Sequence, residues 1–85
     1  MPKYKLIYFN ARGRGETIRL LFEIAGVEYE DKRIDYDTEW ADLKPNTPFG
    51  VLPILEVDGK QLTESRAIYS YLAKEFEIPN LFVWM

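Results

Sequence analysis

The chain has 85 residues, of which 47% are hydrophobic and 29% charged, and its net charge at pH 7 is −3. This length allows one domain with a thin core, and the composition is that of a globular protein. The acidic charge argues against nucleic acid as a partner. The lack of cysteine and histidine excludes disulfides, thiol redox chemistry and the usual zinc sites, so we expect no metal. No apolar run is long enough to span a membrane and the start lacks a signal-peptide core, which predicts a cytoplasmic protein without a membrane partner.

The first third of the chain predicts a strand followed by a helix. Residues 4–9 are aromatic and β-branched and predict the strand. From Glu16 onward apolar side chains recur at the spacing of one helix face, and Gly26 stands where a helix would end. The apolar positions of this helix are Ile18, Leu21, Phe22 and Ala25. The charged residues Glu16, Arg19 and Glu23 fall on its other faces.

The next two elements are less regular. Residues 27–34 predict a second strand, although a strongly charged one. Residues 37–44 predict a short helix that runs into the turn-rich stretch from Lys44 to Pro48. A helix between two strands of one sheet makes the strands parallel, with a right-handed crossover.

The second half of the chain predicts a hairpin and a last helix. Asp58-Gly59 joins residues 54–57 to residues 61–63 and is typical of a two-residue turn, so these segments should be antiparallel neighbours. Apolar residues then recur at helical spacing, and Pro79 would close the helix. They are Ala67, Ile68, Tyr71, Leu72 and Phe76. The order β-α-β followed by β-β-α predicts an α/β fold with a four-stranded mixed sheet and helices packed on it.

Two neighbouring features indicate a binding site for an extended peptide. Pro53 has no N–H and disfavours helix at Leu52, so we expect Leu52 to be extended, with its own N–H and C=O free at a sheet edge. Glu64-Ser65 stands at the head of the last helix, and a helix N-terminus attracts anions. Free backbone beside such a terminus suits an extended anionic ligand.

Three segments then carry a family resemblance: residues 4–16 (YKLIYFNARGRGE), 48–59 (PFGVLPILEVDG) and 62–72 (LTESRAIYSYL). In this order and spacing they resemble the N-terminal, thioredoxin-like domain of cytosolic glutathione transferases, most closely the sigma class, to which vertebrate prostaglandin D synthase is related. The likeness implies that residues 1–77 form a βαβ-ββα domain with a cis proline at Pro53. It also implies that the peptide is glutathione, bound as a substrate.

The resemblance implies a role for each residue along this edge. Leu52 would pair its backbone with the cysteinyl unit of glutathione, and Val51 and Pro53 would line the same groove. Ser65 and the N–H groups of its helix would hold the γ-glutamyl carboxylate. Glu64 would face the γ-glutamyl ammonium group.

The remaining roles concern the thiol and the glycyl end of the ligand. Lys44 and the Trp40 indole would reach the glycyl carboxylate. In transferases of this type a tyrosine hydroxyl donates a hydrogen bond to the thiolate, which is the nucleophile, and Tyr8 takes that role here. Arg14 would add positive charge nearby. Tyr4, the competing tyrosine, is interpreted as structural.

Each of these residues also has a plainer interpretation. By position alone Tyr8 would be a core tyrosine and Ser65 a helix cap, and Lys44 and Arg14 would be solvated charges. Phe49 is either packed within its loop or a contact of a homodimer. Both alternatives for Phe49 stay open at this point.

The sequence departs from the family in two ways. Glu64 stands where sigma enzymes usually carry glutamine, which leaves the class, and a consensus or engineered origin, open. Family members continue into a helical domain that supplies the electrophile pocket, so we expect little or no activity from this chain alone. The apolar tail, residues 78–85, would then cover the surface left by that domain, with residues 81–85 folding back onto it. The alternative function is a non-catalytic thioredoxin-like scaffold or interaction module.

Overall fold

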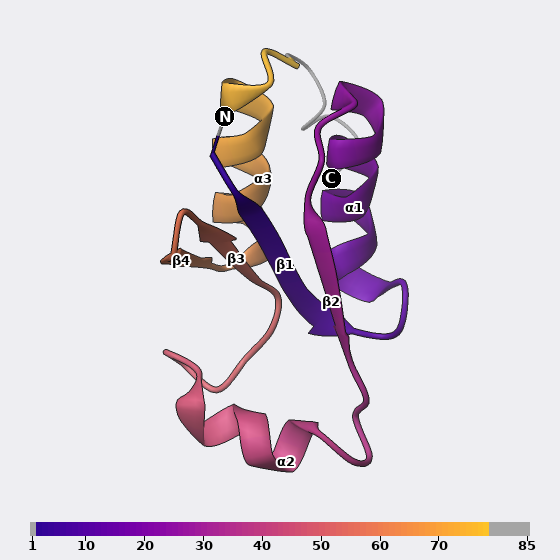
Figure 1. The fold of residues 1–85 in the computed structure, drawn as a ribbon, viewed down its shortest axis with the longest axis vertical. Helices are drawn as coiled ribbons and strands as arrows, with labels where there is room; N and C mark the ends of the chain where they lie inside the picture. Colours follow the sequence, from indigo (N-terminus) through magenta and orange to yellow (C-terminus); the bar gives the residue numbers. More distant parts are fainter. Residues whose placement is uncertain (1, 79–85) are drawn as a thin grey trace.

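The computed structural model describes residues 2–78 of the chain (Figure 1). Its elements follow the predicted order. The strands are β1 (Tyr4–Phe9), β2 (Glu30–Ile34), β3 (Ile54–Val57) and β4 (Lys60–Thr63). The helices are α1 (Gly13–Ala25), α2 (Trp40–Leu43) and α3 (Ser65–Glu75), and a 3₁₀ turn (Lys44–Asn46) follows α2.

The four strands form one mixed sheet in the order β2-β1-β3-β4. β1 is parallel to β2 and antiparallel to β3, and β3 is antiparallel to β4. The crossover from β1 to β2 runs through α1, which lies beside α3 in Figure 1. The predicted α/β fold with a four-stranded mixed sheet is therefore confirmed.

Two clusters of buried side chains hold the sheet in place. Leu6 and Leu55 point to the side of α1 and α3, where the larger cluster forms. Ile7 and Ile54 alternate with them and belong to the second cluster, against which α2 packs. Tyr8, near the end of β1, also belongs to the second cluster, and its ring lies against the first turn of α1.

Three element boundaries differ from the sequence prediction. β2 begins at Glu30 rather than residue 27. Glu30 pairs with Lys5, and because β1 begins at Tyr4, residues 27 and 28 have no partner on it. α1 begins at Gly13 rather than Glu16, one turn before the apolar pattern starts. The short helix covers Trp40–Leu43 rather than residues 37–44. The reason is that the N–H groups of Asp37 and Thr38 donate to the Asp35 carboxylate in a tight turn before the helix.

The buried faces of the long helices also differ from the prediction. In α3 Ala67 is exposed and Tyr71 is half-buried, whereas Tyr69 and Ala73 are buried with Ile68 and Leu72. In α1 the prediction that Arg19 lies off the apolar face is wrong, because its side chain is 4% exposed. The correction moves the buried stripe of α3 by one position around the helix, whereas in α1 it widens the buried stripe to include Arg19.

The remaining expectations about the chain as a whole are tested only in part. Within residues 2–78, no helix has the length and apolar character that crossing a membrane requires. Ile78 packs against the larger cluster. The predicted fold-back of residues 81–85 lies outside the described residues.

Tyr4 provides a test of the larger cluster. Its ring packs edge-on against Phe22 at 5.2 Å, and burial raises the pKa of its hydroxyl above the ordinary 10.0. The folded state therefore holds this proton more tightly than the unfolded chain does. That contribution to stability is complete below pH 10.0 and is lost as the pH rises through the higher folded pKa.

We expect Tyr4→Phe to reduce the alkaline loss of stability. Urea unfolding at intervals from pH 8 to pH 11 would show a shallower decline in the free energy of unfolding for the variant than for the wild type. The pKa of Tyr29 is raised too, chiefly by burial, so Tyr29→Phe should remove a further part of the slope. An unchanged slope in Tyr4→Phe would contradict the assignment.

Candidate functional site

The register of the sheet brings three predicted segments to one edge. Ile7 pairs with Ile54, and Ile54 pairs with Thr63. One step beyond these pairs lie Tyr8 on β1, Pro53 before β3 and Glu64 after β4. The carboxyl ends of β1, β2 and β4 therefore meet the start of β3.

Tyr8 is held against the first turn of α1. Its side chain is largely buried, with 9% of the residue exposed. A methyl group added at Gly15 would come within 2.6 Å of the ring carbon Cγ, and one at Gly13 within 3.2 Å of Cζ. The Tyr8 ring therefore occupies the space that the side chain of any residue other than glycine at position 13 or 15 would need. The Tyr8 hydroxyl accepts a hydrogen bond from the backbone N–H of Arg14 at 3.1 Å. Its own proton remains available for a further acceptor.

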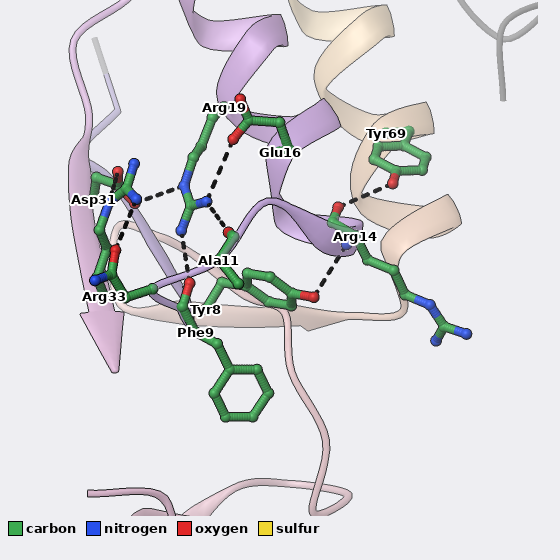
Figure 2. Close-up of polar contacts among 10 residues, drawn as sticks. Tyr8, Phe9, Ala11, Arg14, Glu16, Arg19, Asp31, Arg33 and Tyr69 are labelled. Carbon is green, nitrogen blue, oxygen red and sulfur yellow. Dashed lines mark hydrogen bonds and ion pairs between the residues drawn. The ribbon is translucent and has the colours of Figure 1, made fainter. Parts of the chain in front are cut away.

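Arg14 contributes to this contact through its backbone. Its N–H donates to Tyr8, and its C=O accepts a hydrogen bond from the Tyr69 hydroxyl of α3 at 3.0 Å (Figure 2). The guanidinium group is exposed and extends away from the Tyr8 ring. The backbone of Arg14 is thus fixed from two sides, while its charge stands at the surface.

The Leu52–Pro53 segment has the expected backbone. The peptide bond between the two residues is cis, as the resemblance implies, and both residues are buried. Within residues 2–78, neither the N–H nor the C=O of Leu52 takes part in a backbone hydrogen bond. Val51, immediately before them, is 45% exposed. The N–H and C=O of Leu52 are therefore available to an extended ligand.

The start of α3 differs in detail from the prediction. Glu64 is the residue that precedes the helix, with a φ of 69° that non-glycine residues rarely adopt, and Ser65 is the first helical residue. The interpretation of Ser65 as the cap is therefore wrong. The first hydrogen bond inside the helix joins the Ile68 N–H to the Glu64 C=O, and no side chain caps the earlier N–H groups. These groups form an uncapped, electropositive helix start.

Trp40 begins α2, which packs against the second cluster, and Lys44 begins the 3₁₀ turn that follows it. The half-buried Trp40 ring packs edge-on against Phe9 at 5.1 Å. The exposed Lys44 side chain passes close to Gly50, since a methyl group there would lie 3.6 Å from Lys44 Cε. Phe49 is 74% exposed, so loop packing does not account for it.

Two other kinds of site are relevant among the described residues. These residues hold no cluster of acidic side chains that could bind a metal ion. A hollow of about 740 Å³ lies at the other end of β1, bordered by Pro2, Tyr4 and Val27, and shares no residue with the edge. The main feature of the edge is the backbone of Leu52, which makes no backbone hydrogen bond within the part of the chain that the structure describes, together with the uncapped start of α3.

Comparison with known proteins agrees with this geometry. The glutathione S-transferase N-terminal domain matches residues 4–74 of the chain. The chain belongs to this domain family. Glutathione S-transferase 1 of Ascaris suum is 57% identical over 76 residues, which are 89% of this chain and 36% of that protein. Hematopoietic prostaglandin D synthase of Gallus gallus is 55% identical over 75 residues, which are 88% of this chain and 37% of that protein.

A solved structure supports the same conclusion. The Nu-class glutathione S-transferase of Haemonchus contortus superposes with a TM-score of 0.88 at 51% identity, over 99% of this chain and 41% of that one. The chain therefore spans roughly two-fifths of the length of these relatives. It is a glutathione S-transferase N-terminal domain by sequence and by fold.

Arg19 is the residue of this transferase domain whose role the sequence pattern did not predict. Its guanidinium group donates to the C=O groups of Phe9 and Ala11, and forms an ion pair with Asp31 (Figure 2). One signal was present in the sequence. Arg19 follows Gly15 by four residues and precedes Phe22 by three, so the three share a helix face.

Gly15 provides a test of how this transferase domain holds Tyr8. Gly15→Ala forces the Tyr8 ring to move, because the new methyl group would overlap it, and overpacking of this kind costs about 1–3 kcal/mol of unfolding free energy. We expect lower stability together with a changed NMR shift of the Arg14 amide, whose hydrogen bond the Tyr8 hydroxyl accepts.

Gly26→Ala is the matched control for this variant. Gly26 ends α1 with a φ of 67° and has no atom within 4 Å of an added methyl group. The control should lose stability through backbone strain alone and leave the Arg14 amide unchanged. The same amide change in both variants would contradict the specific contact between Tyr8 and Gly15.

Proposed function

We propose that this domain binds glutathione along the edge that carries Tyr8, Leu52 and Ser65, and that Tyr8 stabilises its thiolate. The observation that carries the proposal is the hydrogen bond from the Arg14 N–H to the Tyr8 hydroxyl. Because that oxygen already accepts an N–H, its proton is directed to another acceptor. A bound thiolate would be such an acceptor, and a hydrogen bond to the charged form favours it over the thiol.

The two ends of glutathione match the two sides of the edge. The uncapped start of α3, with the Ser65 hydroxyl, suits the γ-glutamyl carboxylate, and Glu64 suits the ammonium group beside it. The exposed Lys44 and the half-buried Trp40 suit the glycyl carboxylate.

The middle of the ligand would pair with the backbone of Leu52. Its N–H and C=O are available, and Val51 and Pro53 would line the groove around the cysteinyl unit. The exposed Arg14 guanidinium adds positive charge at the same edge. Together these groups match a tripeptide with two carboxylates, one ammonium and a thiol.

The chemistry of the complete enzyme would be attack of this thiolate on an electrophilic or lipid-derived substrate, giving a glutathione thioether. The relatives are more than twice as long as this chain, and the part of them outside this match would supply the electrophile pocket. We further propose a sigma-like class and a cytosolic location. We also propose a homodimer with Phe49 at its contact, because the Phe49 ring is 74% exposed. Alone, the domain would bind glutathione with little or no turnover.

Glutathione titration of this chain tests the binding proposal. Trp40 fluorescence reports the site, and Trp84→Phe leaves it as the only tryptophan. We expect saturable binding that Ser65→Ala weakens about tenfold or more, since a hydrogen bond to a charged group contributes about 1.5–3 kcal/mol. Ser70→Ala, an exposed serine on the same helix, is the control and should leave the affinity unchanged. Absence of binding at millimolar glutathione would support the scaffold alternative instead.

Tyr8→Phe tests the role of the hydroxyl separately from binding. It keeps the ring against Gly13 and Gly15, so affinity for glutathione should change little. The pKa of the bound thiol should rise, and any turnover of an aryl halide should fall about 100-fold, the loss expected when one donor to a reacting anion is removed. The measurement is thiolate absorbance against pH in the complex. A thiol that titrates identically in the variant and the wild type would exclude this role for Tyr8.

A further inference from the structure

Arg19 connects three parts of the domain from a buried position. Its Nη2 donates to the Phe9 C=O at 3.0 Å and its Nη1 to the Ala11 C=O at 2.6 Å. Its Nε donates to the Asp31 carboxylate of β2 at 3.1 Å. Only 4% of Arg19 is exposed, and a charge is buried to this extent only where it is paired.

The two carbonyl groups belong to the segment that leads from β1 into α1. This segment is also the connection between Tyr8 and Arg14, whose hydroxyl and N–H form the contact at the site. Arg19 lies against the same ring, with its guanidinium carbon 5.7 Å from the Tyr8 centroid. Figure 2 shows Arg19 to the upper left of the Tyr8 ring and the Arg14 contact at the hydroxyl end, on the right. A shift of the segment would therefore alter the position of the Arg14 N–H relative to the hydroxyl.

The positive charge of Arg19 is balanced by its neighbours. Asp31 is shared with Arg33 at 2.9 Å, and Glu16 lies 3.5 Å from Arg19 Nη1. Two carboxylates thus face two guanidinium groups, so the charges of this cluster balance. What another cation could not reproduce is the planar fork, which reaches two carbonyl groups and one carboxylate at once.

We propose that Arg19 is a positioning residue for Tyr8, holding the β1–α1 connection so that the tyrosine hydroxyl accepts the Arg14 N–H. The position of the hydroxyl follows from this chain alone. The consequence for the thiol rests on the proposed function of the domain. Because the fork rather than the charge is what acts, lysine is not an adequate replacement.

The first test needs no ligand. The Arg14 amide proton is followed by NMR shift and hydrogen exchange in Arg19→Lys and Arg19→Met, and Tyr8→Phe defines the signal without the hydroxyl. We expect both Arg19 variants to move the amide toward its Tyr8→Phe position, and the lysine variant to move it nearly as far as the methionine variant. Arg33→Met is the comparison variant: it removes the other arginine on Asp31 and the hydrogen bond to the Asn10 side chain, and it leaves the contacts of Arg19 with the C=O groups of Phe9 and Ala11 in place.

The second test uses glutathione as the probe. In both Arg19 variants the pKa of the bound thiol should rise by about one unit, because a displaced hydroxyl donates a weaker hydrogen bond to the thiolate and a tenfold loss of that preference is one pKa unit. Arg33→Met should leave this pKa unchanged. If the wild type binds no glutathione, the proposed function fails, and the Arg14 amide still decides the role of Arg19.

The result that would overturn the inference is a loss of stability alone. A folded Arg19→Lys protein with a wild-type Arg14 amide, and with a wild-type thiol pKa where glutathione binds, would make Arg19 merely structural. If Arg19→Met does not fold, Arg19→Lys alone decides between the two roles. Asp31→Asn, which leaves both carbonyl contacts in place, then serves as the milder comparison.

Discussion

The close approach of the Tyr8 ring to the first turn of α1 is the constraint on which the site depends. The turn has glycine at 13 and 15, which allows the approach but weakens the helix start, and Arg12 before it offers no side-chain cap. The Tyr8 hydroxyl takes over that task, because it accepts an N–H of the first turn as a serine or aspartate cap would. The group proposed to act on the thiol is therefore also one that stabilises the helix. A tyrosine with this second role is fixed in place before any ligand arrives.

The two long helices start at the same edge of the sheet but are completed differently. α1 follows β1 and has its first turn capped by Tyr8, whereas α3 follows β4 and has no side-chain cap. An anion is thus favoured at the start of α3, and a hydrogen-bond acceptor near the hydroxyl at the start of α1. The parallel relation of β1 and β2 and the antiparallel pairing of β3 determine this arrangement, since they bring the ends of three strands and the start of the fourth together.

The sequence predicts most of the fold because apolar spacing and turn residues report on local geometry. The hairpin at Asp58-Gly59 and the parallel relation of β1 and β2 follow from such signals, whereas the pairing of β1 with β3 was not predicted. The role of Arg19 was not predicted because charge normally indicates a solvated face, and its partners, the C=O groups of Phe9 and Ala11, carry no side-chain signature. The interpretation of Ser65 as a cap failed for a related reason. Whether Glu64 or Ser65 precedes the helix depends on the backbone at Glu64, whose positive φ the sequence does not predict. The resemblance suggested which residues to propose at the edge, and only the folded structure shows that Arg14 contacts Tyr8 through its backbone.

The aromatic side chains beside the edge connect the two ends of the proposed glutathione site. The Phe9 ring packs against Tyr8 at 5.4 Å, against Trp40 at 5.1 Å and against Tyr36 at 5.6 Å. The group proposed to act on the thiol and the indole proposed to reach the glycyl carboxylate therefore rest on the same side chain. The backbone of Phe9 is in turn held by Arg19 through its C=O. A ligand that displaces α2 at one end would act on the packing of Tyr8 at the other, because close-packed side chains transmit small displacements. Binding at the carboxylate end and activation of the thiol would then be coupled within this one domain, independently of the surface that selects the electrophile.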